Sequence, residues 1–124
     1  MLLAALASAL ITSCYDGDTC TTKTGEKVRL ACIDTPELRG KRAEPVPAKA
    51  ARDHLRGLVV GKKVGIQRIT KDSYGRTVAE LFAGETNVQR EMVATGHAEI
   101  IRRYAYQFPW TIGPAASSWS TLSW

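Results

Sequence analysis

Two segments organise this chain: Tyr15-Asp16-Gly17-Asp18-Thr19 and Val28-Arg29-Leu30-Ala31-Cys32-Ile33-Asp34-Thr35-Pro36-Glu37. Each group of carboxylates in them follows a run of apolar or β-branched residues, which is typical of a strand that ends in a loop. Carboxylate oxygens gathered at strand ends suit a hard cation such as calcium. The two segments therefore predict a meander of strands with an acidic site at its loops.

Arginines accompany these carboxylates. Arg29 lies in the second segment, and Arg76 follows later in the turn Asp72-Ser73-Tyr74-Gly75-Arg76. The planar guanidinium can hold two phosphate oxygens at once, so an arginine beside a cation site suits a phosphate group. The cation site, the two arginines and the additional carboxylate of Glu37 together indicate hydrolysis of a phosphodiester.

Three elements of the sequence resemble the staphylococcal nuclease-like (thermonuclease) family in order and spacing. They are Asp-Gly-Asp-Thr at 16–19, Val-Arg-Leu-x-x-Ile-Asp-Thr-Pro-Glu at 28–37 and Tyr-Gly-Arg-Thr at 74–77. The resemblance extends from about Ala9 to about Tyr104. It implies a calcium site formed by Asp18, Asp34 and the backbone carbonyl of Thr35, with Asp16 in a supporting position.

The resemblance also implies catalytic roles. Arg29 and Arg76 would clamp the phosphate and stabilise the charge of the transition state, which is usually the largest catalytic contribution. Glu37 would act on the attacking water, as its general base or as the acceptor that orients it. Tyr74 and Tyr104 match positions where the family places tyrosines around the nucleotide, and the family cleaves to products that end in a 3′-phosphate.

Periodicity and turn signals predict strands over 9–15, 19–24, 27–33, 63–70 and 77–83, and helices over 47–60 and 86–95. Pro47 suits the first turn of the first helix. Thr86 and Gln89 form a capping box for the second helix, and Gly96 stops it. These patterns alone predict a small α+β domain. The resemblance implies a mainly β, five-stranded OB-type Greek-key barrel with two helices.

Strand alternation leaves one conflict. Arg29 and Asp34 differ in parity, so a regular strand over 27–33 would point them to opposite faces of the sheet. A bend or bulge near Cys32 would bring them together.

The 124 residues suit a single domain, which we place at 9–106. Residues 1–8 resemble a signal remnant, with an A-x-A pattern at Ala7-Ser8-Ala9. Residues 107–124 form an atypical tail, disordered or in place of the family's C-terminal helix. We expect a secreted or periplasmic protein, with a cytoplasmic location as the alternative, and no transmembrane segment.

Charge and cysteine content complete the sequence-based expectations. The net charge is +5, and residues 39–71 contain ten Lys or Arg against two acidic residues, which favours polyanionic partners. The three cysteines, Cys14, Cys20 and Cys32, cannot all pair with one another, so at least one is free or bonds outside the chain. We expect them to be core thiols in strands.

The sequence favours a calcium-dependent monomeric nuclease that hydrolyses single-stranded DNA and RNA with little sequence preference and needs no stable protein partner. The first alternative is a non-catalytic OB-fold module that binds nucleic acid. The second is an inactive, truncated product, suggested by the atypical tail.

Overall fold

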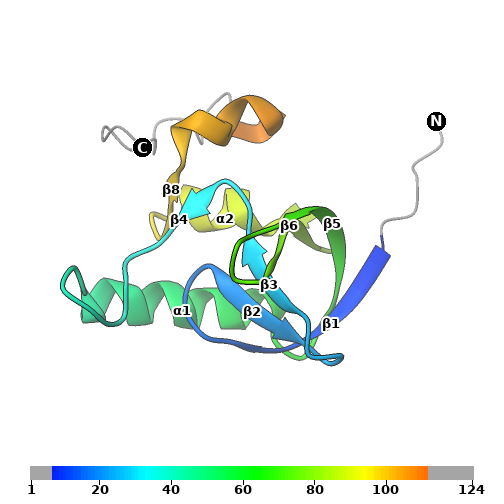
Figure 1. The fold of residues 1–124 in the computed structure, drawn as a ribbon, viewed down its shortest axis with the longest axis horizontal. Coiled ribbons are helices and arrows are strands. Elements are labelled where there is room, and N and C mark those ends of the chain that lie inside the picture. The colour runs from blue at the N-terminus through cyan, green and yellow to red at the C-terminus, as the bar shows by residue number, and fades with distance from the viewer. Residues whose placement is uncertain (1–6, 112–124) are drawn as a thin grey trace.

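Five strands form a closed barrel in the computed structural model, which describes residues 7–111 (Figure 1). They are β1 (Ala7–Cys14), β2 (Thr19–Thr22), β3 (Lys27–Leu30), β5 (Lys63–Lys71) and β6 (Thr77–Ala83). Neighbours follow the order β3-β2-β1-β5-β6, and a parallel pairing of β3 with β6 closes the barrel. The predicted five-stranded, mainly β barrel is confirmed.

Shorter elements cover the barrel. Two α-helices and two 3₁₀ turns lie in the described part of the chain, α1 (Pro45–Val59), α2 (Val88–Ala94), η1 (Arg102–Gln107) and η2 (Pro109–Thr111). β4 (Ile33–Asp34) pairs with β8 (Glu99–Ile100), and β7 (Thr86–Asn87) extends the sheet beside β6. In Figure 1, α1 lies beside the strands in the lower part of the view, and the orange 3₁₀ turns lie above them at the top. None of the helices within residues 7–111 is long and apolar enough to cross a membrane.

The core forms because strand and helix periodicities point apolar residues to the same interior. Along β6, Thr77, Ala79 and Leu81 alternate inward. On α1, Ala51, Leu55 and Val59 are buried, as their helical spacing predicts. Complete burial of a leucine or valine side chain stabilises the folded state by roughly 1.5–3 kcal/mol.

The predicted strand over 27–33 is interrupted near Cys32, where the different parity of Arg29 and Asp34 called for a bend. β3 ends at Leu30, Cys32 has a φ of 69°, and the chain resumes as β4. A residue in the left-handed region turns the chain, so the alternation of side chains is not carried from Arg29 to Asp34. The predicted bend near Cys32 is confirmed.

The helix starts differ from prediction. Asn87 caps α2 by accepting a hydrogen bond from Arg90 N at 3.0 Å, while Thr86 belongs to β7, so the predicted capping box is wrong. Gln89 is fully buried instead. Its Oε1 accepts from Leu81 N at 3.0 Å, because the backbone of β6 needs partners there.

Helix α1 begins at Pro45 rather than Pro47. Both prolines fit, because the first helical turn has no partner for its N–H groups. Gly96, with a φ of 81°, follows the end of α2 as predicted.

Packing extends beyond both predicted domain limits. Ala7 and Ser8 pair with β5 at Ile66 and Gly65. At the other end, Phe108 and Thr111 are buried. The rest of the predicted signal remnant and tail, residues 1–6 and 112–124, lies outside the described residues.

Two of the three cysteines form a disulfide, Cys14–Cys20, so the prediction of core thiols is wrong for them. They face each other directly across the antiparallel pair of β1 and β2, which brings their side chains together. Cys32 is free and buried.

Candidate active site

The acidic turn, residues 15–19, connects β1 to β2 and directs Asp18 into the protein. Asp18 is only 7% exposed. Its Oδ1 accepts a hydrogen bond from Thr19 Oγ1 at 3.1 Å, and its Oδ2 accepts from Thr35 Oγ1 at 3.1 Å and from Thr35 N at 3.3 Å. These bonds join the acidic turn to the chain that follows β4.

Two neighbouring carboxyl groups have perturbed proton affinities. Asp16 accepts a hydrogen bond from Asp18 N at 3.0 Å, and burial together with the charge of Asp18 raises the pKa of Asp16 to about 6. Burial, and then the charge of Asp18, also raises the pKa of Asp34. Asp18 therefore repels both Asp16 and Asp34 when they are ionised, and a cation beside Asp18 would be favoured.

Arg29 supplies positive charge at this point. Its Nη2 lies 3.6 Å from Asp18 Oδ2 and 3.9 Å from Asp34 Oδ1, and its Nη1 donates to Leu30 O at 2.6 Å. Asp18 and Asp34 thus converge on a single guanidinium group, although they come from different segments of the chain.

Arg29 also lines a pocket of about 530 Å³ together with Arg76 and Tyr104. The remaining wall is largely apolar and includes Ile69, Val78, Ile101 and Phe108. Two guanidinium groups beside an apolar wall suit a ligand that combines a phosphate with a flat organic ring.

The predicted tyrosines differ in position. Tyr104 lines the pocket and is 40% exposed, whereas Tyr74 is 83% exposed and projects from the turn between β5 and β6. The guanidinium carbon of Arg76 lies 5.3 Å from the centre of the Tyr74 ring. Tyr74 therefore contacts the arginine but does not line the pocket.

Glu37 lies on the exposed loop between β4 and α1. Its backbone carbonyl accepts a hydrogen bond from Glu44 N at 2.9 Å. Its charge adds a small contribution to the raised pKa of Asp34, after burial and Asp18. Glu37 is thus within electrostatic reach of the carboxylates but stands at the edge of the site.

The donors around Asp18 fit a hard cation. Among residues 7–111, no three His, Cys, Asp or Glu side chains are arranged to enclose a metal ion. The candidate ligand oxygens are those of Asp18 and Asp34, which both approach Arg29 Nη2, and Thr35 is hydrogen-bonded to Asp18. Oxygen donors suit calcium rather than a transition metal, and a small protein ligand set leaves coordination positions for water and a phosphate oxygen.

Two features of the site were missed from sequence. Asp72 holds Arg76, since its Oδ2 accepts from Arg76 Nε at 2.6 Å and its Oδ1 accepts from Arg76 N at 2.9 Å. The disulfide Cys14–Cys20 encloses the acidic turn. The available signals were the position of Asp72 at the base of a hairpin turn and the placement of two cysteines on either side of Asp-Gly-Asp-Thr.

Comparison with known proteins identifies the family of this chain. Residues 27–110 match the family model described as Staphylococcal nuclease homologue. An uncharacterised endonuclease of Haemophilus influenzae is 38% identical over 95 residues, which cover 73% of this chain and 51% of the relative. A probable staphylococcal-like nuclease of Oryza sativa subsp. japonica is 32% identical over 95 residues, covering 76% of this chain and 24% of the relative.

An uncharacterised endonuclease of Escherichia coli O157:H7 is 31% identical over 93 residues, covering 72% of this chain and 58% of the relative. The chain thus spans less than two thirds of the length of each of these three proteins. The match to the family model covers most of the chain, and the chain belongs to the staphylococcal nuclease homologue family.

Proposed function

We propose that this protein is a calcium-dependent nuclease that hydrolyses phosphodiester bonds in DNA and RNA. The observation that carries the proposal is the position of Arg29, which contacts Asp18 and Asp34 and also lines the pocket that contains Arg76. Membership of the family, and relatives described as an endonuclease and a probable staphylococcal-like nuclease, support nuclease activity.

The two arginines would bind and stabilise the reacting phosphate. Asp72 accepts a hydrogen bond from Arg76 Nε, so the two terminal nitrogens of Arg76 are the ones that would face a phosphate. Arg29 would approach from the side of the carboxylates. Charge grows on the phosphate oxygens as water adds to phosphorus, and two preorganised guanidinium groups stabilise that charge.

Glu37 would accept the proton of the attacking water. As the new oxygen–phosphorus bond forms, the bond to the 5′ oxygen breaks and that oxygen takes up a proton, which leaves a 3′-phosphate. Asp18, Asp34 and the carbonyl of Thr35 would hold calcium, with Asp16 in support, and the ion supplies further positive charge to the phosphate.

Base recognition would depend on stacking rather than on sequence. Tyr104 lines the pocket beside its apolar wall, and Tyr74 stands exposed next to Arg76. Stacking of a base on an aromatic ring contributes roughly 1–3 kcal/mol and tolerates any base. The basic surplus over residues 39–71 adds attraction for the phosphate backbone. Single-stranded DNA and RNA are therefore the proposed substrates.

The disulfide bears on where the protein works. Disulfides form and persist in oxidising compartments. Cys14–Cys20 therefore supports a secreted or periplasmic location for this protein, which we propose to act as a monomer.

The test is release of acid-soluble nucleotides from single-stranded DNA, with calcium and then with a chelator. We expect release that calcium activates and the chelator abolishes. Binding without release by a folded chain would indicate the non-catalytic module instead. No cooperative unfolding transition in circular dichroism would indicate the inactive product.

The variant Glu37→Gln examines the role of the general base. Turnover should fall by about 10²–10⁴-fold, the usual contribution of acid–base catalysis, while affinity for single-stranded DNA should stay nearly unchanged. Fluorescence anisotropy with a labelled oligonucleotide measures that affinity. Equal losses of turnover and affinity would remove Glu37 from this role.

A further inference from the structure

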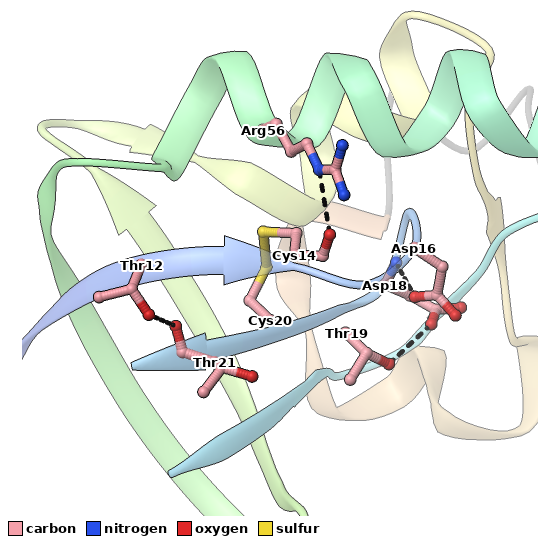
Figure 2. Close-up of a disulfide and its surroundings, with 8 residues drawn as sticks. All are labelled: Thr12, Cys14, Asp16, Asp18, Thr19, Cys20, Thr21 and Arg56. Atoms are coloured by element: carbon pink, nitrogen blue, oxygen red, sulfur yellow. Dashed lines mark hydrogen bonds between the residues drawn. A yellow bond between two sulfur atoms is a disulfide. The ribbon is translucent and has the colours of Figure 1, made fainter. Parts of the chain in front are cut away.

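A covalent ring encloses the acidic turn. Cys14 and Cys20 occupy directly opposed positions on β1 and β2, and their disulfide closes the chain around residues 15–19 (Figure 2). Tyr15 N donates a hydrogen bond to Thr19 O at 2.9 Å inside this ring. Asp16 and Asp18 therefore lie on a short loop whose two ends are fixed to each other.

Helix α1 holds the same ring from outside. Figure 2 shows Arg56 extending from α1 toward the disulfide, where its Nε donates to Cys14 O at 3.0 Å. This bond joins Cys14, the residue before the acidic turn, to a helix residue 42 positions later in the sequence.

The middle of the turn is wedged between two other elements. A Cβ atom on Gly17 would lie 2.8 Å from Ala51 Cβ on α1 and 2.9 Å from Thr35 Cγ2. Such distances are too short for a side chain, so the backbone of the turn packs directly against the helix and against Thr35. The ring, the arginine and this close packing all restrict the same five residues.

These restraints oppose an electrostatic tendency to spread. Asp18 repels both Asp16 and Asp34 when they are ionised, and Arg29 contacts Asp18 and Asp34. Without a cation, an unrestrained turn would separate its carboxylates, and binding would then require that they be brought back. A turn that is already held together avoids this ordering cost.

We propose that the Cys14–Cys20 disulfide and Arg56 are positioning residues that hold the acidic turn in the geometry that binds calcium. The inference rests on the proposed calcium site. Both cysteines are at most 1% exposed, so the disulfide is shielded from external thiols and acts as a permanent restraint.

The test compares cation affinity in folded variants. Terbium serves as the luminescent probe of the calcium site, excited through nearby tyrosines, and calcium is then added in competition. In Cys14→Ala/Cys20→Ala the dissociation constant for both ions should rise about 10–100-fold, as for other residues that orient metal ligands. Arg56→Ala should shift it in the same direction by a smaller factor.

Arg52→Ala is the matched control, because Arg52 lies on the same helix and its Nε bonds to the adjacent Asp53 rather than to the turn. Its affinity for terbium should equal that of the wild type. Circular dichroism melts confirm that each variant is folded at the temperature of the titration.

The outcomes separate this inference from the proposed function. Wild-type affinity in folded Cys14→Ala/Cys20→Ala and in Arg56→Ala would overturn the positioning role, even if the wild type binds calcium and cleaves DNA. If the cysteine variant does not fold, Arg56→Ala against Arg52→Ala decides, and equal affinities overturn the proposal. A wild type that cleaves no DNA and binds neither ion would contradict the proposed function itself.

Discussion

The two charged turns of the site are held in place by different means. The acidic turn, residues 15–19, has internal hydrogen bonds and a disulfide that joins its two ends, and it is also held by two remote residues, Arg56 on α1 and Thr35 after β4. The turn between β5 and β6 depends on itself. There, Asp72 Oδ1 accepts from Tyr74 N at 3.0 Å, and Asp72 N donates to Arg76 O at 2.9 Å.

The two turns are held in different ways because they carry different charges. Like charges in the acidic turn repel, so tertiary contacts must hold them together. In the other turn a single carboxylate and a single guanidinium attract each other and organise the hairpin locally. The carboxylate side chains also differ in exposure: the side chain of Asp18 alone is 10% exposed, and that of Asp72 is 20% exposed. The geometry of the acidic turn should therefore be sensitive to substitutions in distant parts of the fold. The geometry of the β5–β6 turn should be sensitive only to substitutions within that turn.

The largest expected contrast is between Arg29→Ala and Arg76→Ala. Arg29→Ala leaves the buried Asp18 without its cation, and loss of one partner of a buried ion pair costs about 3 kcal/mol. Arg76→Ala leaves Asp72 unpaired near the surface, where water solvates the carboxylate, so the loss of stability should be much smaller. Urea denaturation at pH 7 measures both, and equal losses would remove the proposed difference between the two turns.

A smaller contrast comes from two glycines near α1. Gly17→Ala should destabilise the protein by about 1–3 kcal/mol, because its Cβ would collide with Ala51 and Thr35. Gly57→Ala is the control. It lies within α1, nothing approaches its Cβ within 4 Å, and it should stabilise the helix by about 0.5–1 kcal/mol. Thermal melts compare the two, and a neutral Gly17→Ala would contradict the tight packing of the acidic turn.

The smallest expected effect concerns Glu26, which joins the β2–β3 turn to β5 and β6. Glu26 accepts two hydrogen bonds from Arg68, at 2.8 and 2.9 Å, and one from Thr77 Oγ1 at 2.8 Å. The bonds from Arg68 contribute most to lowering the pKa of Glu26 from 4.5 to about 2. Since the folded state favours the ionised form, this stabilisation is present above pH 4.5 and is lost as the pH falls toward 2.

Glu26→Gln should therefore destabilise the protein by about 0.5–1 kcal/mol at pH 7, since both partners are partly exposed to solvent. The difference from the wild type should shrink below pH 4.5. Urea denaturation at a series of pH values measures it. A difference that stays constant down to pH 3 would show that Glu26 acts through packing rather than charge.

Local patterns predicted much of the fold. The β6 strand at 77–83 agrees with the structure, and the apolar spacing of α1 identified its buried face. The start of α2 was predicted wrongly because the side chain of Gln89 could form either of two interactions. It could cap the helix or accept a hydrogen bond from the backbone of β6. The tertiary structure shows the second, since Gln89 is buried and accepts from Leu81 N.

In the candidate site, too, some features followed from the sequence and others did not. The spacing of Arg29 and Asp34 required a bend, and the left-handed Cys32 provides it. The disulfide could not be predicted from the presence of three cysteines, because the pairing depends on the register of β1 against β2. Arg56 could not be assigned at all, since its partner is a backbone carbonyl in a distant strand.

The most direct measurement is turnover of single-stranded DNA, with saturating calcium, by the wild type, Arg29→Ala, Arg76→Ala and the double variant. If both arginines act on one phosphate, each single change should lower turnover by about 10²–10³-fold, the usual cost of losing one donor to a transition state. The loss of turnover in the double variant should be smaller than the product of the two single losses, because the effects of groups that act as a unit are not additive. Single variants that are folded and as active as the wild type would contradict a shared catalytic site.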